Sequence, residues 1–373
     1  MPPMPPFTCP LQRVRDTCAL ALARSPALVS IDPAALAAFA RGPLASLASD
    51  PELAAEGVNF PLRLSPDEDM DLTTVFALLQ LGSGYRAELH AACGAGASDT
   101  LLRGLLCFAL GGRRPTAGVL QHLRAAEVAD IWGIPRDVDE PVGPHLPGVT
   151  ISRPGPLAPL VERITGALNG AGAALAAAGA GSFAELYRAR AGEWAVDGVP
   201  RVARFVAFLV AALPAGFRDV ADVPADAGHA ADAAPPPSTE VWLLKKAQLC
   251  ARELGRKFGA SEPRLFGWPA QDGGALTVFA DNVLPAVLRA EGVLRLGEGL
   301  AARIDAGEAV TGAEGALLRA AAVVAGGAIV RAMAEGGGEP MSEARLDSLL
   351  WRAGKVPKYR ALKRHAEKDT SMY

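Results

Sequence analysis

Helix-capping signals followed by apolar residues at helical spacing recur along this sequence. The clearest is Ser65–Glu68, in which a serine and a glutamate three residues apart form a capping box and a proline takes the first helical position. Thr311 and Glu314 form a second box, and Ser342 is a further candidate N-cap. Because leucine, valine and alanine follow each signal at helical spacing, the sequence predicts several well-defined helices.

Weaker patterns of the same kind predict helices elsewhere. We expect them over residues 11–22, 34–40, 98–110, 116–128, 160–175, 201–213 and 241–254. Only residues 276–279 alternate as a strand would, and this run is too short to build a sheet. Abundant alanine and an aromatic content of 6% also favour helix over sheet. The prediction is an all-α, compact, multi-helix globular fold.

Stretches rich in proline or alanine mark the parts that we expect to lie outside helices. Residues 1–10 are expected to be disordered, and residues 133–159 to form a long connection without regular structure. Residues 221–238 are biased to alanine, aspartate and proline, which predicts a mobile surface insertion. We therefore expect one domain over residues 11–373 that carries an insertion at about 221–238.

The charge balance argues against a polyanionic partner. The chain has 37 Lys and Arg against 40 Asp and Glu, a net charge of −3, so direct nucleic-acid binding is not expected. Pro214 ends the apolar run 205–213, and Gly326–Gly327 interrupt the run 320–330, so no membrane span is expected. We expect a cytoplasmic protein, because no secretory signal pattern opens the chain and its five cysteines show no CxxC spacing. A monomer is also expected.

Common catalytic and cofactor motifs are not found. The five histidines lack the spacings of metal sites, so no metal is predicted. The sequence has neither a GxSxG elbow nor a P-loop. Residues 170–174 look like a dinucleotide fingerprint, but they follow a helical rather than a strand pattern, so we expect no dinucleotide and no other cofactor.

Two acidic residues stand among apolar neighbours. Asp281 lies within the apolar segment 276–285, and Asp347 lies between Leu346 and the run 349–351. A buried carboxylate must be hydrogen-bonded or must serve a function, because burying it unpaired is expensive. The pattern leaves open that Asp281 is a plain N-cap of a helix over 283–290 and that Asp347 faces solvent.

The same residues carry a resemblance to a known family. The chain resembles the queuosine salvage proteins, which are queuosine 5′-phosphate N-glycosylases, and it looks closest to the fungal branch of that family. The resemblance extends from residue 11 to 373, apart from the insertion. It rests on segments 57–61, 81–86, 217–219, 245–247, 278–285 and 346–351.

The resemblance implies an all-helical, cofactor-free hydrolase, similar to helical glycosylases, that releases queuine and ribose 5-phosphate from queuosine 5′-phosphate. Asp281 matches the catalytic aspartate, and a carboxylate there suits the positive charge that develops at C1′ of the ribose. Phe279 matches a residue of the base pocket, where an aromatic ring can stack on a deazapurine. Asp347 matches an acid that accepts the N–H donors of a guanine-like edge.

For the 5′-phosphate the expected ligands are Lys245 and Arg360, with a solvated surface cation as the alternative for each. Many relatives carry an aromatic residue and a second acid where this chain has Ser348 and Arg352, so recognition of the cyclopentenediol is expected to differ. A histidine that precedes the Asn-Phe segment in relatives has no counterpart, because His90 is the first histidine of this chain.

Two other functions remain open from the sequence. One is a helical glycosylase that acts on another nucleotide. The other is a non-catalytic α-helical scaffold that buries Asp281 and Asp347 as helix caps. A site that holds Phe279, Asp281 and Asp347 together would argue against the scaffold.

Overall fold

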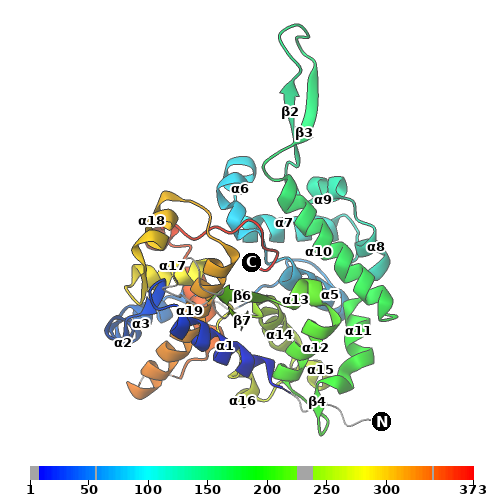
Figure 1. Cartoon of the computed structure of the whole chain (residues 1–373). Coiled ribbons are helices and arrows are strands. Elements are labelled where there is room, and N and C mark those ends of the chain that lie inside the picture. The colour runs from blue at the N-terminus through cyan, green and yellow to red at the C-terminus, as the bar shows by residue number, and fades with distance from the viewer. Residues whose placement is uncertain (1–7, 55–56, 225–237, 338–339) are drawn as a thin grey trace. The chain divides into compact units, whose positions relative to one another are not determined.

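The computed structural model is a mostly helical protein, as the sequence predicts (Figure 1). It describes residues 8–54, 57–224, 238–337 and 340–373, and within these the strands form only two-stranded sheets. Residues 1–7 and 225–237, which fall in the expected disordered segment and insertion, lie outside the described residues. The expectation of one domain over 11–373 stays a prediction.

Backbone contacts divide the chain into two compact units. Unit 1 consists of Met1–Asn59, Ala191–Ala211 and Phe217–Asp369, and unit 2 consists of Phe60–Arg190, Ala212–Gly216 and Thr370–Tyr373. All residues that the sequence predicts for the functional site belong to unit 1.

Unit 1 contains most of the helices and three of the two-stranded sheets. Its elements are α1 (Pro10–Arg24), β1 (Val29–Ile31), α2 (Pro33–Arg41), α3 (Pro43–Ala48), α4 (Pro51–Ala54), η2 (Ala191–Glu193), β4 (Ala195–Val196), β5 (Val199–Pro200), α12 (Val202–Ala212), β6 (Val220–Pro224), β7 (Ser238–Trp242), α14 (Lys245–Phe258), α15 (Pro263–Phe266), α16 (Ala270–Gly273), α17 (Val283–Ala290), β8 (Leu294–Leu296), α18 (Glu298–Ala306), α19 (Gly312–Glu335), α20 (Glu343–Ala353) and α21 (Pro357–Arg360). The paired strands are β1 with β8, β4 with β5 and β6 with β7, all antiparallel.

Helix α19 forms the centre of unit 1. Its predicted capping box is confirmed: the N–H of Glu314 donates to Thr311 Oγ1 (3.2 Å), and the N–H of Thr311 donates to Glu314 Oε2 (2.9 Å). Every residue from 315 to 323 is buried, so this part of the helix has no solvent-facing side. Helices α1, α2, α17 and α20 pack against it, which makes α19 the element that positions the rest of the unit (Figure 1).

The helix that opens at the Thr311 capping box, α19, runs without a break through Gly326 and Gly327, so these glycines interrupt the apolar run but not the helix. Among the described helices it is the one that is long and apolar enough to cross a membrane by length and composition. However, 67% of its most apolar window is buried inside the fold, and the core helix of a soluble protein can have the same length and apolar composition. A Cβ atom on Gly326 would lie 2.7 Å from Cγ1 of Val278, so the glycine allows α19 to approach the segment that leads to Asp281.

The helix expected over 241–254 begins later in the structure. Residues 238–242 form β7, which pairs with β6 in the register Val220↔Trp242, and α14 starts only at Lys245. Residues 221–224 and 238 of the expected insertion are therefore strand residues, so the expectation of a mobile surface insertion is wrong for these described residues.

Unit 2 is built mainly from helices. Its elements are α5 (Pro66–Leu78), η1 (Ser83–Tyr85), α6 (Arg86–Cys93), α7 (Ala97–Leu110), α8 (Ala117–Gln121), α9 (Ala125–Trp132), β2 (Asp137–Pro141), β3 (Thr150–Pro154), α10 (Ala158–Ala177), α11 (Phe183–Arg190) and α13 (Pro214–Phe217). Helix α10 packs against α8 and α9, and α5 packs against α11. The capping box at Ser65 and Glu68 is confirmed at the start of α5.

Two expectations for unit 2 are wrong. The helix expected over 116–128 is split into α8 and α9, because His122 ends α8 and Arg124 is the N-cap of α9. Residues 133–159 are not irregular, since β2 and β3 pair into an antiparallel hairpin. Figure 1 shows this hairpin extending away from α9 and α10 of its own unit.

The close approach at Gly326 gives a first prediction. Gly326→Ala should lower the free energy of unfolding by about 1–3 kcal/mol, because the added methyl group overpacks the contact with Val278. Gly299→Ala is the matched control, since a Cβ there meets nothing within 4 Å and alanine favours helix by up to about 1 kcal/mol. Urea unfolding of the two variants measures both effects. Equal stability of the two variants would contradict the role given to Gly326.

Candidate active site

Asp219 fixes the start of helix α14. Its backbone carbonyl accepts the N–H groups of Leu243 (3.0 Å) and Leu244 (3.4 Å), and its Oδ2 accepts the N–H of Lys245 (3.4 Å). Leu244 has φ = 53°, a left-handed conformation that is uncommon for a residue other than glycine. The surrounding hydrogen bonds hold this backbone turn, and it starts α14 with Lys245 as the first helical residue.

Arg319 of α19 connects Asp219 to the segment that carries Asp281. Its guanidinium is 3% exposed and forms a two-contact pair with the Asp219 carboxylate, through Nη1–Oδ1 at 3.1 Å and through Nη2–Oδ2. Arg319 Nε also donates to the carbonyl of Ala280 (2.8 Å). Removing either partner of such a buried pair leaves an uncompensated charge, which costs about 3–5 kcal/mol.

The segment 276–282 has no regular secondary structure, although residues 276–279 alternate like a strand. Side chains rather than a neighbouring strand satisfy its backbone. The N–H of Thr277 donates to Gln248 Oε1 (2.9 Å), the N–H of Phe279 donates to Asp347 Oδ1 (2.8 Å), and Arg319 binds the Ala280 carbonyl. These bonds from α14, α20 and α19 allow a non-helical segment to be fully buried.

Asp281 is buried, and both of its carboxylate oxygens have an electropositive neighbour. Oδ1 accepts the N–H of Val283, the first residue of α17, at 2.7 Å, and Oδ2 lies 3.9 Å from Nζ of Lys245. The alternative that Asp281 is the N-cap of this helix is wrong, because the N-cap is Asn282; Asp281 precedes it and binds the N–H of the first helical residue. The contact with Lys245 is additional, because capping a helix does not require a buried ammonium group.

Asp347 is also buried, so the alternative that it faces solvent from α20 is wrong. Burial, followed by the charge of the nearby Asp281, raises the pKa of Asp347 to about 7, and the hydrogen bond from the Phe279 N–H partly opposes this rise. Phe279 itself is 3% exposed. Phe279, Asp281, Asp347 and Lys245 thus meet in one buried cluster within unit 1.

Two adjacent lysines at the start of α14 are buried in this cluster. Lys245 is 6% exposed, and burial lowers its pKa while the Asp281 charge opposes that effect. Lys246 is 0% exposed, and burial, followed by the charge of Lys245, lowers its pKa to about 7. Within the part of the chain that the structure describes, Lys246 Nζ has no hydrogen-bond partner. The alternative that Lys245 is a solvated surface cation is therefore wrong.

Arg360 is placed differently from the other predicted site residues. It is exposed at the C-terminal end of α21, which agrees with the alternative of a surface cation. Ser348 and Arg352, the departures from the family pattern, both lie on α20, and Ser348 Oγ donates to the carbonyl of Ala344 (3.3 Å).

Asp219, Arg319, Lys246 and Gln248 support the cluster but were not predicted as site residues. Asp219 and Lys246 lie in segments 217–219 and 245–247, which carry the family resemblance. Arg319 had a local signal, since it is a lone charge within the apolar run of a capped helix. His365 was not predicted as a site residue, yet it is buried, and its carbonyl accepts a hydrogen bond from Asn282 Nδ2 (3.0 Å).

Across the described residues, no three His, Cys, Asp or Glu side chains are grouped to hold a metal ion.

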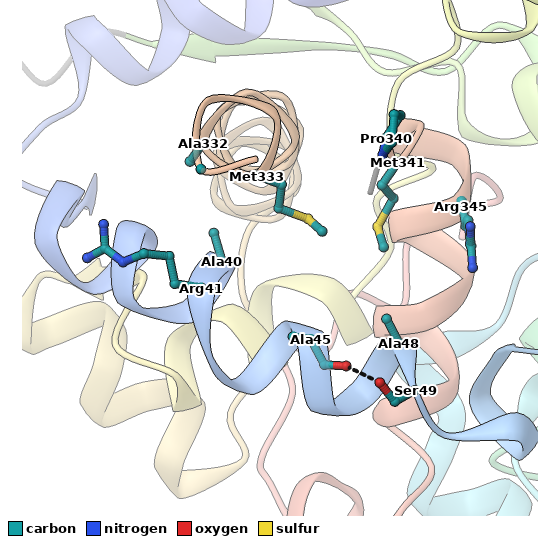
Figure 2. A pocket seen from close by; sticks show the side chains of 11 residues that line it. Ala40, Arg41, Ala45, Ala48, Ser49, Ala332, Met333, Pro340, Met341 and Arg345 are labelled. Atoms are coloured by element: carbon teal, nitrogen blue, oxygen red, sulfur yellow. Dashed lines mark hydrogen bonds between the residues drawn. The ribbon is translucent and has the colours of Figure 1, made fainter. Parts of the chain in front are cut away.

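A separate pocket of about 340 Å³ lies in unit 1 between α2, α3, α19 and α20. Figure 2 shows Met333 and Met341 on two sides of it, with Arg41 and Arg345 among its other lining residues. None of the predicted site residues lines this pocket.

The pKa of Asp347 gives a second prediction. The folded protein holds the Asp347 proton more tightly than the unfolded chain, so this stabilisation is full below about pH 4 and is lost as the pH rises through about 7. Asp347→Asn cannot ionise and keeps an oxygen for the N–H of Phe279. Relative to the wild type, this variant should therefore gain free energy of unfolding as the pH rises from about 5 to about 8. Urea unfolding at both pH values measures this change.

Asp305→Asn is the matched control for this prediction. Asp305 is exposed on α18, and its hydrogen bond with Arg289 lowers its pKa, so it is ionised at both pH values. The difference in free energy of unfolding between Asp305→Asn and the wild type should be the same at both pH values. If the difference between Asp347→Asn and the wild type were also the same at both pH values, this would contradict the assigned protonation of Asp347.

Comparison with known proteins identifies the family of this chain. A family model described as queuosine salvage protein matches residues 152–373, more than half of the chain, and this range contains every residue of the buried cluster. The match assigns no branch within the family and does not include residues 11–151, for which the resemblance stays a prediction. Comparison with curated protein sequences gives no significant match. The chain belongs to the queuosine salvage protein family.

Proposed function

We propose that this protein hydrolyses the N-glycosidic bond of queuosine 5′-phosphate and releases queuine and ribose 5-phosphate. Two observations support the proposal: the family membership, and the convergence of Asp281, Asp347, Lys245 and Phe279 in one buried cluster. The reaction needs groups that stabilise a cationic sugar and hold a polar base, and the cluster contains side chains of both kinds.

Asp281 is assigned to the sugar. As the C1′–N bond breaks, its electron pair goes to the base nitrogen and positive charge develops at C1′. The oxygen of a water molecule then bonds to C1′, and the proton that this water loses balances the proton that the base nitrogen gains. A buried carboxylate stabilises this charge strongly, because little water screens the interaction. The Val283 N–H and Lys245 hold the carboxylate in place before substrate binds, so it need not reorganise during the reaction.

Phe279 and Asp347 are assigned to the base. Phe279 offers an aromatic face for stacking on a deazapurine, and its backbone N–H fixes Oδ1 of Asp347. We assign Oδ2 of Asp347 to the N–H donors of the guanine-like edge, which a carboxylate accepts well. Because its pKa is about 7, Asp347 exchanges its proton near neutral pH, and N–H donors from a bound base would favour the carboxylate form.

Lys245 is given two roles in this proposal. It holds the Asp281 carboxylate in the absence of substrate, and it remains, with Arg360, a predicted ligand of the 5′-phosphate. The substrate is proposed to be the free nucleotide rather than tRNA, and the site of action the cytoplasm. The likeness to the fungal branch and the altered recognition at Ser348 and Arg352 also stay predictions.

The arrangement of the charges favours an enzyme over a scaffold. A scaffold would need Asp281 only as a helix cap and would gain nothing from Lys245 and Lys246, since each buried lysine carries a desolvation cost. A glycosylase for another nucleotide would use the same Asp281. That alternative enzyme would differ only in the base that it recognises. Measuring the hydrolysis of other nucleotides distinguishes it from the proposed enzyme.

The role of Asp281 gives a third prediction. Asp281→Asn keeps an oxygen for the N–H of Val283 but removes the charge, so queuine release should fall by at least about 10³-fold. Mass spectrometry of free queuine measures the rate, and circular dichroism with thermal melting checks that the variant is folded. Asp305→Asn, an exposed aspartate of the same unit, should keep the wild-type rate. A folded Asp281→Asn variant with a rate within about tenfold of wild type would contradict the mechanism.

A further inference from the structure

The hairpin formed by β2 and β3 has one apolar face that is open to solvent. The register pairs Val138 with Arg153 and Glu140 with Ile151, and Val142 N–H donates to the carbonyl of Val149 (3.0 Å). Opposite residues of an antiparallel pair share a face, so these six side chains lie on the same face. The four apolar ones, Val138, Val142, Val149 and Ile151, are 41%, 50%, 47% and 47% exposed.

The opposite face of the hairpin has a different character. It carries Asp137, Asp139, Pro141, Thr150, Ser152 and Pro154. This alternation gives an amphipathic hairpin, and such alternation normally marks a sheet with one face packed against other residues. All ten residues of β2 and β3 are nevertheless exposed.

The edges of the hairpin are poorly suited to adding another strand. Val142 N–H binds Val149 and Gly155 N–H binds the carbonyl of Arg136 (2.8 Å), so positions 137, 139 and 141 direct their backbone groups outward, as do 150, 152 and 154. Pro141 and Pro154 occupy two of these outward positions and have no N–H to donate. Prolines at such positions blunt an edge, so contact through the apolar face is favoured over strand addition.

Charge identifies the kind of partner that fits this face. At its middle, Glu140 and Arg153 lie diagonally across the ladder and form an ion pair of 2.9 Å, so the face has no net charge. A second copy of the same face, related by a two-fold axis, can place each Glu140 against the other copy's Arg153 while the apolar side chains meet. The acidic residues Asp137 and Asp139 on the opposite face disfavour a polyanion or an anionic membrane surface.

We infer that this face, made of Val138, Glu140, Val142, Val149, Ile151 and Arg153, is a homodimer contact in which two hairpins pack face to face. The face has six residues, against roughly 20–30 per partner in a standard interface, so the dimer is weak and forms reversibly with concentration. The sequence-based expectation of a monomer then holds only at low concentration. This inference does not depend on the proposed catalytic function.

A charge-swap experiment tests the inference on the full-length protein. In sedimentation velocity over a concentration series, the wild type should show a monomer–dimer equilibrium. Glu140→Arg alone and Arg153→Glu alone should each weaken dimerisation by at least about tenfold, since like charges then meet across the two-fold axis. An equimolar mixture of the two variants should restore association, because each copy then meets the opposite charge.

Asp139→Arg is the matched control, since it makes the same change of charge on the opposite face of the same strand. It should leave the dissociation constant of the dimer within about twofold of wild type. A wild type that sediments as a monomer up to its solubility limit would overturn the inference. It would equally be overturned by a dimer that both single variants leave unchanged, or by a mixture that fails to associate.

Discussion

The guanidinium of Arg319 joins three parts of unit 1 that are distant in the sequence. It pairs with Asp219, whose carboxylate and carbonyl set the start of α14, and it binds the carbonyl of Ala280, next to Asp281. The positions of Lys245 and Asp281 therefore both depend on one buried ion pair. Arg319 lies on the fully buried stretch of α19. The packing of the core around α19 therefore fixes the position of Arg319 and, through it, the positions of the site residues.

This dependence explains why so many charged groups are buried in one place. Three aspartates, two lysines and one arginine are buried close together, and burial shifts the pKa values of Asp347 and Lys246 to about 7. Such an arrangement is costly for stability alone, because each charge loses its hydration. Closely spaced titratable groups with shifted pKa values are typical of functional sites. The family membership agrees with a functional rather than a stabilising role for these charges.

Local signals predict the helices well, and long-range bonds decide the rest. The capping boxes at Ser65 and Thr311 depend on residues three positions apart, so the sequence alone places both helix starts. The segment 276–282 depends on Gln248, Asp347 and Arg319, none of which is near it in sequence. All residues of this segment are buried, Thr277 included, so the alternation over 276–279 does not mark one buried and one exposed face.

The contrast between local sequence signals and long-range contacts also applies to the candidate site and to the hairpin. Asp281 and Asp347 stand out in the sequence as acids among apolar residues, whereas Asp219 and Arg319 acquire their meaning only when the fold brings them together. The prolines that suggested an irregular connection over 133–159 lie partly at outward edge positions of β2 and β3, where proline is compatible with a strand. Composition could not distinguish these positions from a loop.

We propose that the buried cluster releases queuine from queuosine 5′-phosphate. The decisive experiment is to incubate the purified protein with queuosine 5′-phosphate, with queuosine and with guanosine 5′-phosphate, and to follow each free base by mass spectrometry. Queuine should be released from the 5′-phosphate, with little or no base released from the other two compounds. No release from queuosine 5′-phosphate, or equal release of guanine from guanosine 5′-phosphate, would contradict this proposal.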